Sequence, residues 1–494
     1  MTGAWIAEAS RLFGGPASNR RPWRGHLARE SLTWLLLTVI SAASLAVAIV
    51  FGRLGLGVAF ALAPAAVLAI CACFRLARGT DGGRFALVTT WTLLLFSTFV
   101  WRARTTAQLN SNPLDRAGML RVALVGAAGI FALGYFSRRR ILTLRIPAAL
   151  RWFCAYLVVA FAAAMTSPLP LQATYRVFEF AVGLLAVIIL ALSIERRRRP
   201  EFLFRLTQTS MVAVLAVVWF EAMALPGKSW EPTPGIDPYT LHGYLPSYAS
   251  NSVGMYGGLL AITSLPFVIR KNNARRYQFV YFALGLVTLL ASQYRTGIVA
   301  FVVALPLVVT PRHRVLIAGA LAAGAALLLA GGFARETAST ATTAFAKGRP
   351  ELVGTLDSRT TYWRAAARLV RERPELGWGL DVGSRRALAS IGDESGSTIH
   401  GTWVEALLGT GLVGTVLLAA SFLLAFREGW KIRTHPIGAA VAGLVLFLMI
   451  RSITGTTLEL FSDVWMIFAA LTLAAHELRA GRPWLLREHR ETHV

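Results

Sequence analysis

The chain has 494 residues, of which 55% are hydrophobic and only 15% are charged. A soluble protein carries about 25% charged residues, so this composition excludes an ordinary soluble enzyme and indicates an integral membrane protein. The formal net charge of +25 is spread over short clusters between apolar runs. That distribution argues against nucleic acid as a partner and follows the positive-inside pattern of membrane proteins.

Apolar runs long enough to cross a hydrocarbon core of about 30 Å recur along the chain. We expect fourteen spans, near 32–51, 54–74, 85–101, 119–136, 149–165, 176–194, 203–224, 253–269, 277–292, 297–309, 315–330, 403–426, 437–451 and 464–478. The predicted fold class is all-α, a polytopic transmembrane helical bundle with one long outer loop that carries a short helix. The predicted domains are a tail at 1–31, a bundle at 32–330, the loop at 331–402, further spans at 403–478 and a tail at 479–494.

Lysine and arginine predict the orientation. An even number of spans places both termini on one side of the membrane. About 30 Lys and Arg lie in the tails and in one set of connections, against about 8 in the short loops of the other set. The positive-inside rule assigns the richer side to the cytoplasm. We therefore expect cytoplasmic termini and place the loop at 331–402 outside.

The long outer loop contains one predictable helix. Asp357 or Ser358 can cap it, the residues from Arg359 onward include no Gly or Pro, and Pro374 ends it. Arg359 and Trp363 are four residues apart and share a face of that helix. The spacing therefore puts an arginine on the stripe that faces the bundle.

Three residues on the predicted outer side combine position with chemistry. Arg295 lies in a short turn between two spans, Arg359 begins the loop helix, and His400 starts the twelfth span. Each alone has an ordinary structural explanation as an interfacial side chain. Together they supply two permanent cations that bind phosphate in bidentate fashion and an imidazole that can accept a proton from a hydroxyl. This combination suits the displacement of a diphosphate leaving group.

The protonation state of His400 follows from its position. A helix begins just after it, so the helix dipole and the two arginines disfavour a positive charge there. We expect a lowered pKa that keeps the imidazole neutral near pH 7. No carboxylate or histidine spacing is typical of a metal site, so we expect chemistry without metal or cofactor.

Four stretches carry a resemblance to a known family. They are SQYRTG at 292–297, SRTTYWRAA to RPELGWG within 358–379, HGTWVEALLGTGLVG at 400–414 and, more weakly, YASNSVGMYGGLLAI at 248–262. In order and spacing they resemble the motifs of the O-antigen ligase and polymerase superfamily, which are bacterial polytopic glycosyltransferases. Gly401 departs from the pattern, since the family often has Asn there.

The resemblance implies an activity and a place for it. The chain would be an inner-membrane glycosyltransferase whose donor is a glycan on undecaprenyl diphosphate, with its active site on the periplasmic face. His400 would activate the acceptor hydroxyl, and Arg295 and Arg359 would hold the diphosphate without metal. The acceptor stays open between lipid A–core, for a ligase, and another lipid-linked repeat unit, for a polymerase.

Further candidates take supporting roles. Arg176, at the outer start of the sixth span, is a possible additional phosphate contact. Trp363 and Asn251 lie within the motifs. Glu405 stands where the family has an acid, yet it is about 140° around the helix from His400, so a structural role is equally open. The Gly409, Gly411 and Gly414 cluster predicts close helix packing.

The alternative hypothesis is a lipid-linked oligosaccharide flippase or another transporter. Such proteins line a midplane cavity with ionisable residues and repeat their two halves. Here the spans are nearly free of charge at mid-depth, and the three candidate residues gather on one predicted side. The sequence therefore favours the transferase.

Overall fold

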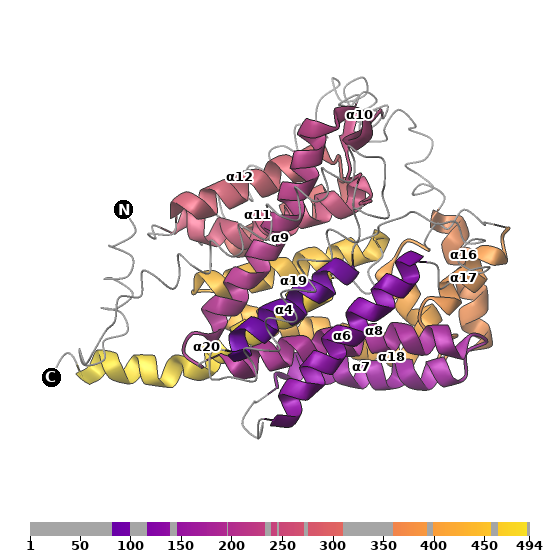
Figure 1. Cartoon of the computed structure of the whole chain (residues 1–494), viewed down its shortest axis with the longest axis horizontal. Helices are drawn as coiled ribbons and strands as arrows, with labels where there is room; N and C mark the ends of the chain where they lie inside the picture. Colours follow the sequence, from indigo (N-terminus) through magenta and orange to yellow (C-terminus); the bar gives the residue numbers. More distant parts are fainter. Residues whose placement is uncertain are drawn as a thin grey trace, which may run out of the picture.

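A computed structural model describes residues 82–98, 116–138, 146–194, 196–232, 239–244, 247–270, 275–309, 359–392, 399–455 and 463–491 (Figure 1). Its helices are α4 (Gly82–Ser97), α6 (Arg116–Arg138), α7 (Ala148–Met165), α8 (Pro170–Ser193), α9 (Arg199–Ala224), α10 (Pro226–Ser229), α11 (Ser250–Ile269), α12 (Arg275–Ala291), α13 (Arg295–Val308), α16 (Arg359–Glu372), α17 (Val382–Ala389), α18 (Thr402–Lys431), α19 (Pro436–Thr454) and α20 (Asp463–Glu491). Two short strands, β1 (Trp230–Pro232) and β2 (Tyr239–Leu241), pair antiparallel. The predicted all-α class is confirmed.

Six of the described helices are long and apolar enough to cross a membrane: α7, α8, α9, α11, α18 and α19. Shorter apolar helices include α12 and α13. Large apolar side chains such as Leu171, Ile130 and Met223 are more than 70% exposed on the described helices, as lipid contact requires. The multi-pass membrane fold is confirmed. Fourteen spans stay a prediction, because the predicted spans at 32–51, 54–74 and 315–330 lie outside the described residues.

Polar contacts at one end of the bundle join connections that the charge pattern assigns to the same side. Arg199, at the start of α9, is 2.9 Å from the Glu477 carboxylate of α20. Arg479 of α20 is 2.9 Å from Glu428 near the end of α18. Arg270, at the end of α11, donates to main-chain carbonyls of the α18–α19 turn. The grouping of these connections agrees with the predicted topology, while the direction of the bundle in the membrane stays a prediction.

The predicted loop helix is confirmed as α16. It begins at Arg359 and ends before Pro374. Ala366 and Leu369 from its buried face pack with Trp378 and with Leu408 of α18 in a small apolar core. Sequence analysis did not predict α17, which follows and packs on both α16 and α18 at one end of the bundle (Figure 1).

Helix α18 is interrupted at Gly411, where φ is 64° and ψ is −166°. The segment that follows α16 fills the break. The Trp378 and Gly379 amides donate to the carbonyls of Leu408 and Gly409 at 2.7 and 2.9 Å. In return, the Leu412 amide donates to the Pro374 carbonyl at 2.8 Å and the Val413 amide to the Glu375 carbonyl at 3.4 Å. The segment 374–379 is thus joined to the membrane helix α18 by main-chain hydrogen bonds.

This joint corrects the prediction of close helix packing for Gly409 and Gly411, two members of the glycine cluster. A Cβ at Gly411 would lie 2.2 Å from the Glu375 oxygen, and one at Gly409 would lie 3.0 Å from the Leu380 side chain. Both glycines therefore admit the loop segment rather than a second helix. The prediction was wrong because a glycine-lined backbone can accept either a helix or a loop as a close neighbour. The sequence periodicity does not reveal which of the two it is.

Candidate functional site

The starts of α13 and α18 meet at the end of α19. The hydroxyls of Thr296 in α13 and Thr454 in α19 are 2.9 Å apart. The Thr402 amide and hydroxyl of α18 both donate to the carbonyl of Gly455, at 3.0 and 2.9 Å. One helix end therefore brings together two turns that are more than 100 residues apart in the chain.

His400 directly precedes this junction and is held by α16. The indole nitrogen of Trp363 donates to the His400 carbonyl at 3.0 Å, and the Tyr362 ring centroid lies 6.1 Å from that of the imidazole. The backbone of His400 has a φ of 50°, a conformation uncommon for residues other than glycine. Its half-buried side chain thus sits on a constrained backbone between α16 and α18.

Gly401 leaves room for this arrangement. Its φ is 156°, and a Cβ there would lie 3.1 Å from the Ile453 carbonyl oxygen and 3.6 Å from the Trp363 indole nitrogen. A side chain at this position would press on the Ile453 carbonyl. The departure from the family's Asn therefore coincides with a close approach of α19.

Arg295 is the first residue of α13 and is half-buried. The turn before it is fixed on two sides. Gln293, with a φ of 47°, donates its amide to the Tyr239 carbonyl of β2 at 3.0 Å. The Tyr294 hydroxyl accepts from Arg451 of α19 at 3.2 Å. These contacts fix the backbone position from which the Arg295 side chain extends.

Arg359 is the first residue of α16, one helical turn before Trp363. Only its backbone position lies within the described structure. Because Trp363 contacts His400, Arg359 and His400 belong to neighbouring elements. That the Arg359 side chain shares the face of Trp363 stays a prediction.

Arg176 has two carboxylates as partners. Its Nη1 lies 3.0 Å from Glu179 and its Nε 3.3 Å from Asp381. It is buried, and no described contact joins it to His400. Its role as a phosphate contact stays a prediction.

The other supporting candidates are Glu405, Asn251 and Trp363. Glu405 is buried, with 3% exposed, and interacts electrostatically with Tyr156 of α7. Asn251 is exposed in the first turn of α11. Trp363 donates a hydrogen bond to the main chain of His400. Among the described residues, no group of three His, Cys, Asp or Glu is placed to hold a metal ion.

Asp463 is a buried carboxylate at the first position of α20. Burial raises its pKa to about 6, against the opposing effect of hydrogen bonds from the Tyr256 hydroxyl and from backbone amides. The only signal in the sequence was an acid at the start of an apolar run.

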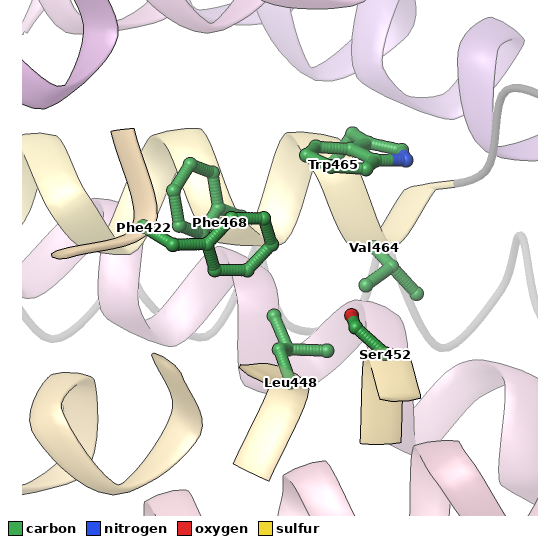
Figure 2. Close-up of a pocket in the computed structure, with 6 residues that line it drawn as sticks. All are labelled: Phe422, Leu448, Ser452, Val464, Trp465 and Phe468. Carbon is green, nitrogen blue, oxygen red and sulfur yellow. The ribbon is translucent and has the colours of Figure 1, made fainter. Parts of the chain in front are cut away.

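A small apolar cavity lies between α18, α19 and α20. It is lined by Phe422, Leu448, Ser452, Val464, Trp465 and Phe468 (Figure 2). Its volume of about 10 Å³ has room for a single water at most. The cavity is a packing defect, far too small for a sugar.

Comparison with known families identifies the central part of the chain. Residues 279–419 match the family model described as O-antigen ligase. This segment is similar to the O-antigen ligase family. It contains Arg295, Arg359 and His400, and it confirms the resemblance to the O-antigen ligase and polymerase superfamily. No curated protein matches the chain.

Proposed function

We propose that this protein is a glycosyltransferase that moves a glycan from undecaprenyl diphosphate to a sugar hydroxyl at the periplasmic face of the bacterial inner membrane. The O-antigen ligase domain supports a ligase-type or polymerase-type activity in general. The observation that carries the finer proposal is the junction at His400. Trp363 joins α16 to it, and the end of α19 joins α13 and α18.

The proposed chemistry uses one base and two cations. The His400 imidazole takes the proton of the acceptor hydroxyl, and the resulting oxygen attacks the anomeric carbon. The bond from that carbon to the diphosphate oxygen breaks, and the diphosphate leaves with the electron pair. Arg295 and Arg359 stabilise its developing charge. Attack opposite the leaving group inverts the anomeric configuration, and no metal takes part.

The protein environment supports this scheme in two ways. Trp363 positions the backbone of His400, and the turn before Arg295 is held by Gln293 and Tyr294.

We assign Glu405 of α18 a structural role, because its carboxylate interacts electrostatically with Tyr156 of α7. Lipid A–core and a second lipid-linked repeat unit both offer the sugar hydroxyl that the reaction requires. The termini face the cytoplasm in this proposal.

Deletion of the gene tests the proposal against the flippase hypothesis. The proposal predicts loss of surface glycan, or its shortening to one repeat unit, with lipid-linked glycan accumulating on the periplasmic leaflet. A glycosidase added to spheroplasts then digests the accumulated glycan. A missing flippase would instead leave the lipid-linked glycan on the cytoplasmic leaflet. Glycan that resists the glycosidase until the membrane is broken would therefore contradict the proposal.

A further inference from the structure

Asp381, just before α17, has an unfavourable local conformation. Its φ is 67°, a region that residues with a side chain rarely adopt. An Asp at a helix start ordinarily accepts hydrogen bonds from the first amides of its own helix. The Asp381 carboxylate makes no such bond, although it is only 4% exposed. Tertiary contacts therefore override the local preference at this residue.

Those contacts tie α17 to the membrane helix α8. Gln172 of α8 donates to the Asp381 carboxylate at 2.8 Å, and Arg176 of α8 is 3.3 Å away. Arg385 of α17 donates twice, at 3.0 Å each. Gly379 adds to the joint, since a Cβ there would lie about 3 Å from atoms of the α7–α8 hairpin.

The ion pair continues into the bundle. Arg176 also binds Glu179, and Glu179 in turn binds Arg121 of α6. Three guanidiniums thus surround two fully buried carboxylates in a chain from α6 through α8 to α17. A buried ionic chain tolerates the loss of a member poorly, because an uncompensated charge is left behind.

The chain reaches His400 through α16. Ala387 of α17 packs with Ala366 of α16 in the small outer core. One turn earlier on α16, Trp363 donates to the His400 carbonyl, and Arg359 begins the same helix. The position of α16 at His400 therefore depends on the attachment of α17.

We infer that Asp381 is a positioning residue for glycan transfer, whose ion pair with Arg176 latches α16 and α17 to α8 and so fixes α16 at His400. This inference rests on the proposed function. Asp381 touches no substrate and acts through α16. Arg176 serves as the membrane half of the latch.

The test compares Asp381→Asn, Arg176→Gln and the double variant in lipid nanodiscs. Each single variant is expected to lose about 10–100-fold in kcat, because small displacements of reacting groups have effects of that size. The double variant should lose no more than the worse single variant. Hydrogen exchange at 382–389 should accelerate while the bundle amides stay unchanged. Glu201→Gln, which removes the exposed pair with Arg205, is the matched control and should change neither readout.

A covalent replacement of the latch separates positioning from general destabilisation. Gln172→Cys and Asp381→Cys are combined after replacing the native Cys71, Cys73 and Cys154. We expect low kcat in the reduced protein and recovery when a short bis-thiol reagent bridges the pair. Unchanged exchange in Asp381→Asn, or no recovery on bridging, overturns the latch. Wild-type protein without transfer activity overturns the proposed function instead.

Discussion

Replacing Gly411 by alanine probes the joint between the outer loop and α18. A Cβ there would lie 2.2 Å from the Glu375 oxygen and 2.6 Å from the Leu376 amide nitrogen, where real side chains do not fit. The backbone angles of Gly411, φ 64° and ψ −166°, fall in a region that is essentially restricted to glycine. The alanine variant must therefore push the loop segment out of the break.

The free-energy cost has two parts. The backbone conformation alone destabilises a residue with a side chain by about 1–3 kcal/mol. Displacing the segment breaks the hydrogen bonds from the Leu412 and Val413 amides to Pro374 and Glu375, each worth about 0.5–1.5 kcal/mol net. We expect a total loss of about 2–6 kcal/mol, concentrated in the joint.

Thermal unfolding and hydrogen exchange of the purified protein measure this loss. The Gly411→Ala variant should melt earlier and exchange faster at 374–380 and 408–413. Gly126→Ala in α6 is the matched control, because no atom lies within 4 Å of its Cβ position and alanine favours the helix by about 0.5–1 kcal/mol. Equal melting and equal exchange in the two variants would refute the interlocked joint.

Further predictions concern charge, metal and pH. Arg295→Lys and Arg359→Lys should each transfer poorly while inserting normally, since lysine lacks the planar bidentate fork; full activity in either would favour a simple electrostatic role. Glycan transfer should survive EDTA. A loss of transfer activity in EDTA that added magnesium restores would show that carboxylates of the protein bind a metal ion. Burial raises the pKa of Asp381, but Arg176 and Arg385 outweigh it and leave the pKa below its ordinary 3.8. The latch therefore stabilises the fold above about pH 4 and is lost as pH falls through the lowered pKa. The melting difference between wild type and Asp381→Asn should be constant from about pH 8 to pH 5 and vanish at lower pH; a difference that shrinks near neutrality contradicts this assignment.

Local patterns predicted part of this site. The absence of Gly and Pro after Arg359, followed by Pro374, located α16. The helical spacing placed Trp363 on the face toward the bundle, and its indole nitrogen donates there to the His400 carbonyl. Both succeed because helix periodicity and proline act on near neighbours in the chain.

Long-range contacts were not predictable in the same way. Asp381 meets Arg176 across 205 residues, and no periodicity links them. The Glu179 partner lies three residues from Arg176, a spacing at which ion pairs form on a helix, but sequence analysis did not single it out. Gly411 lies in an apolar run whose pattern is that of an unbroken helix, so only the position of the Glu375 backbone reveals the break.

The most direct test of the central claim is the turnover of purified His400→Ala with a lipid diphosphate-linked glycan donor. General-base catalysis contributes about 10²–10⁴-fold, so turnover should fall by that order with donor binding unchanged. His242→Ala, at the residue directly after β2, should turn over like wild type. The wild-type product should carry the inverted anomeric configuration. Wild-type turnover in His400→Ala, or a product that retains the donor's configuration, would contradict the account.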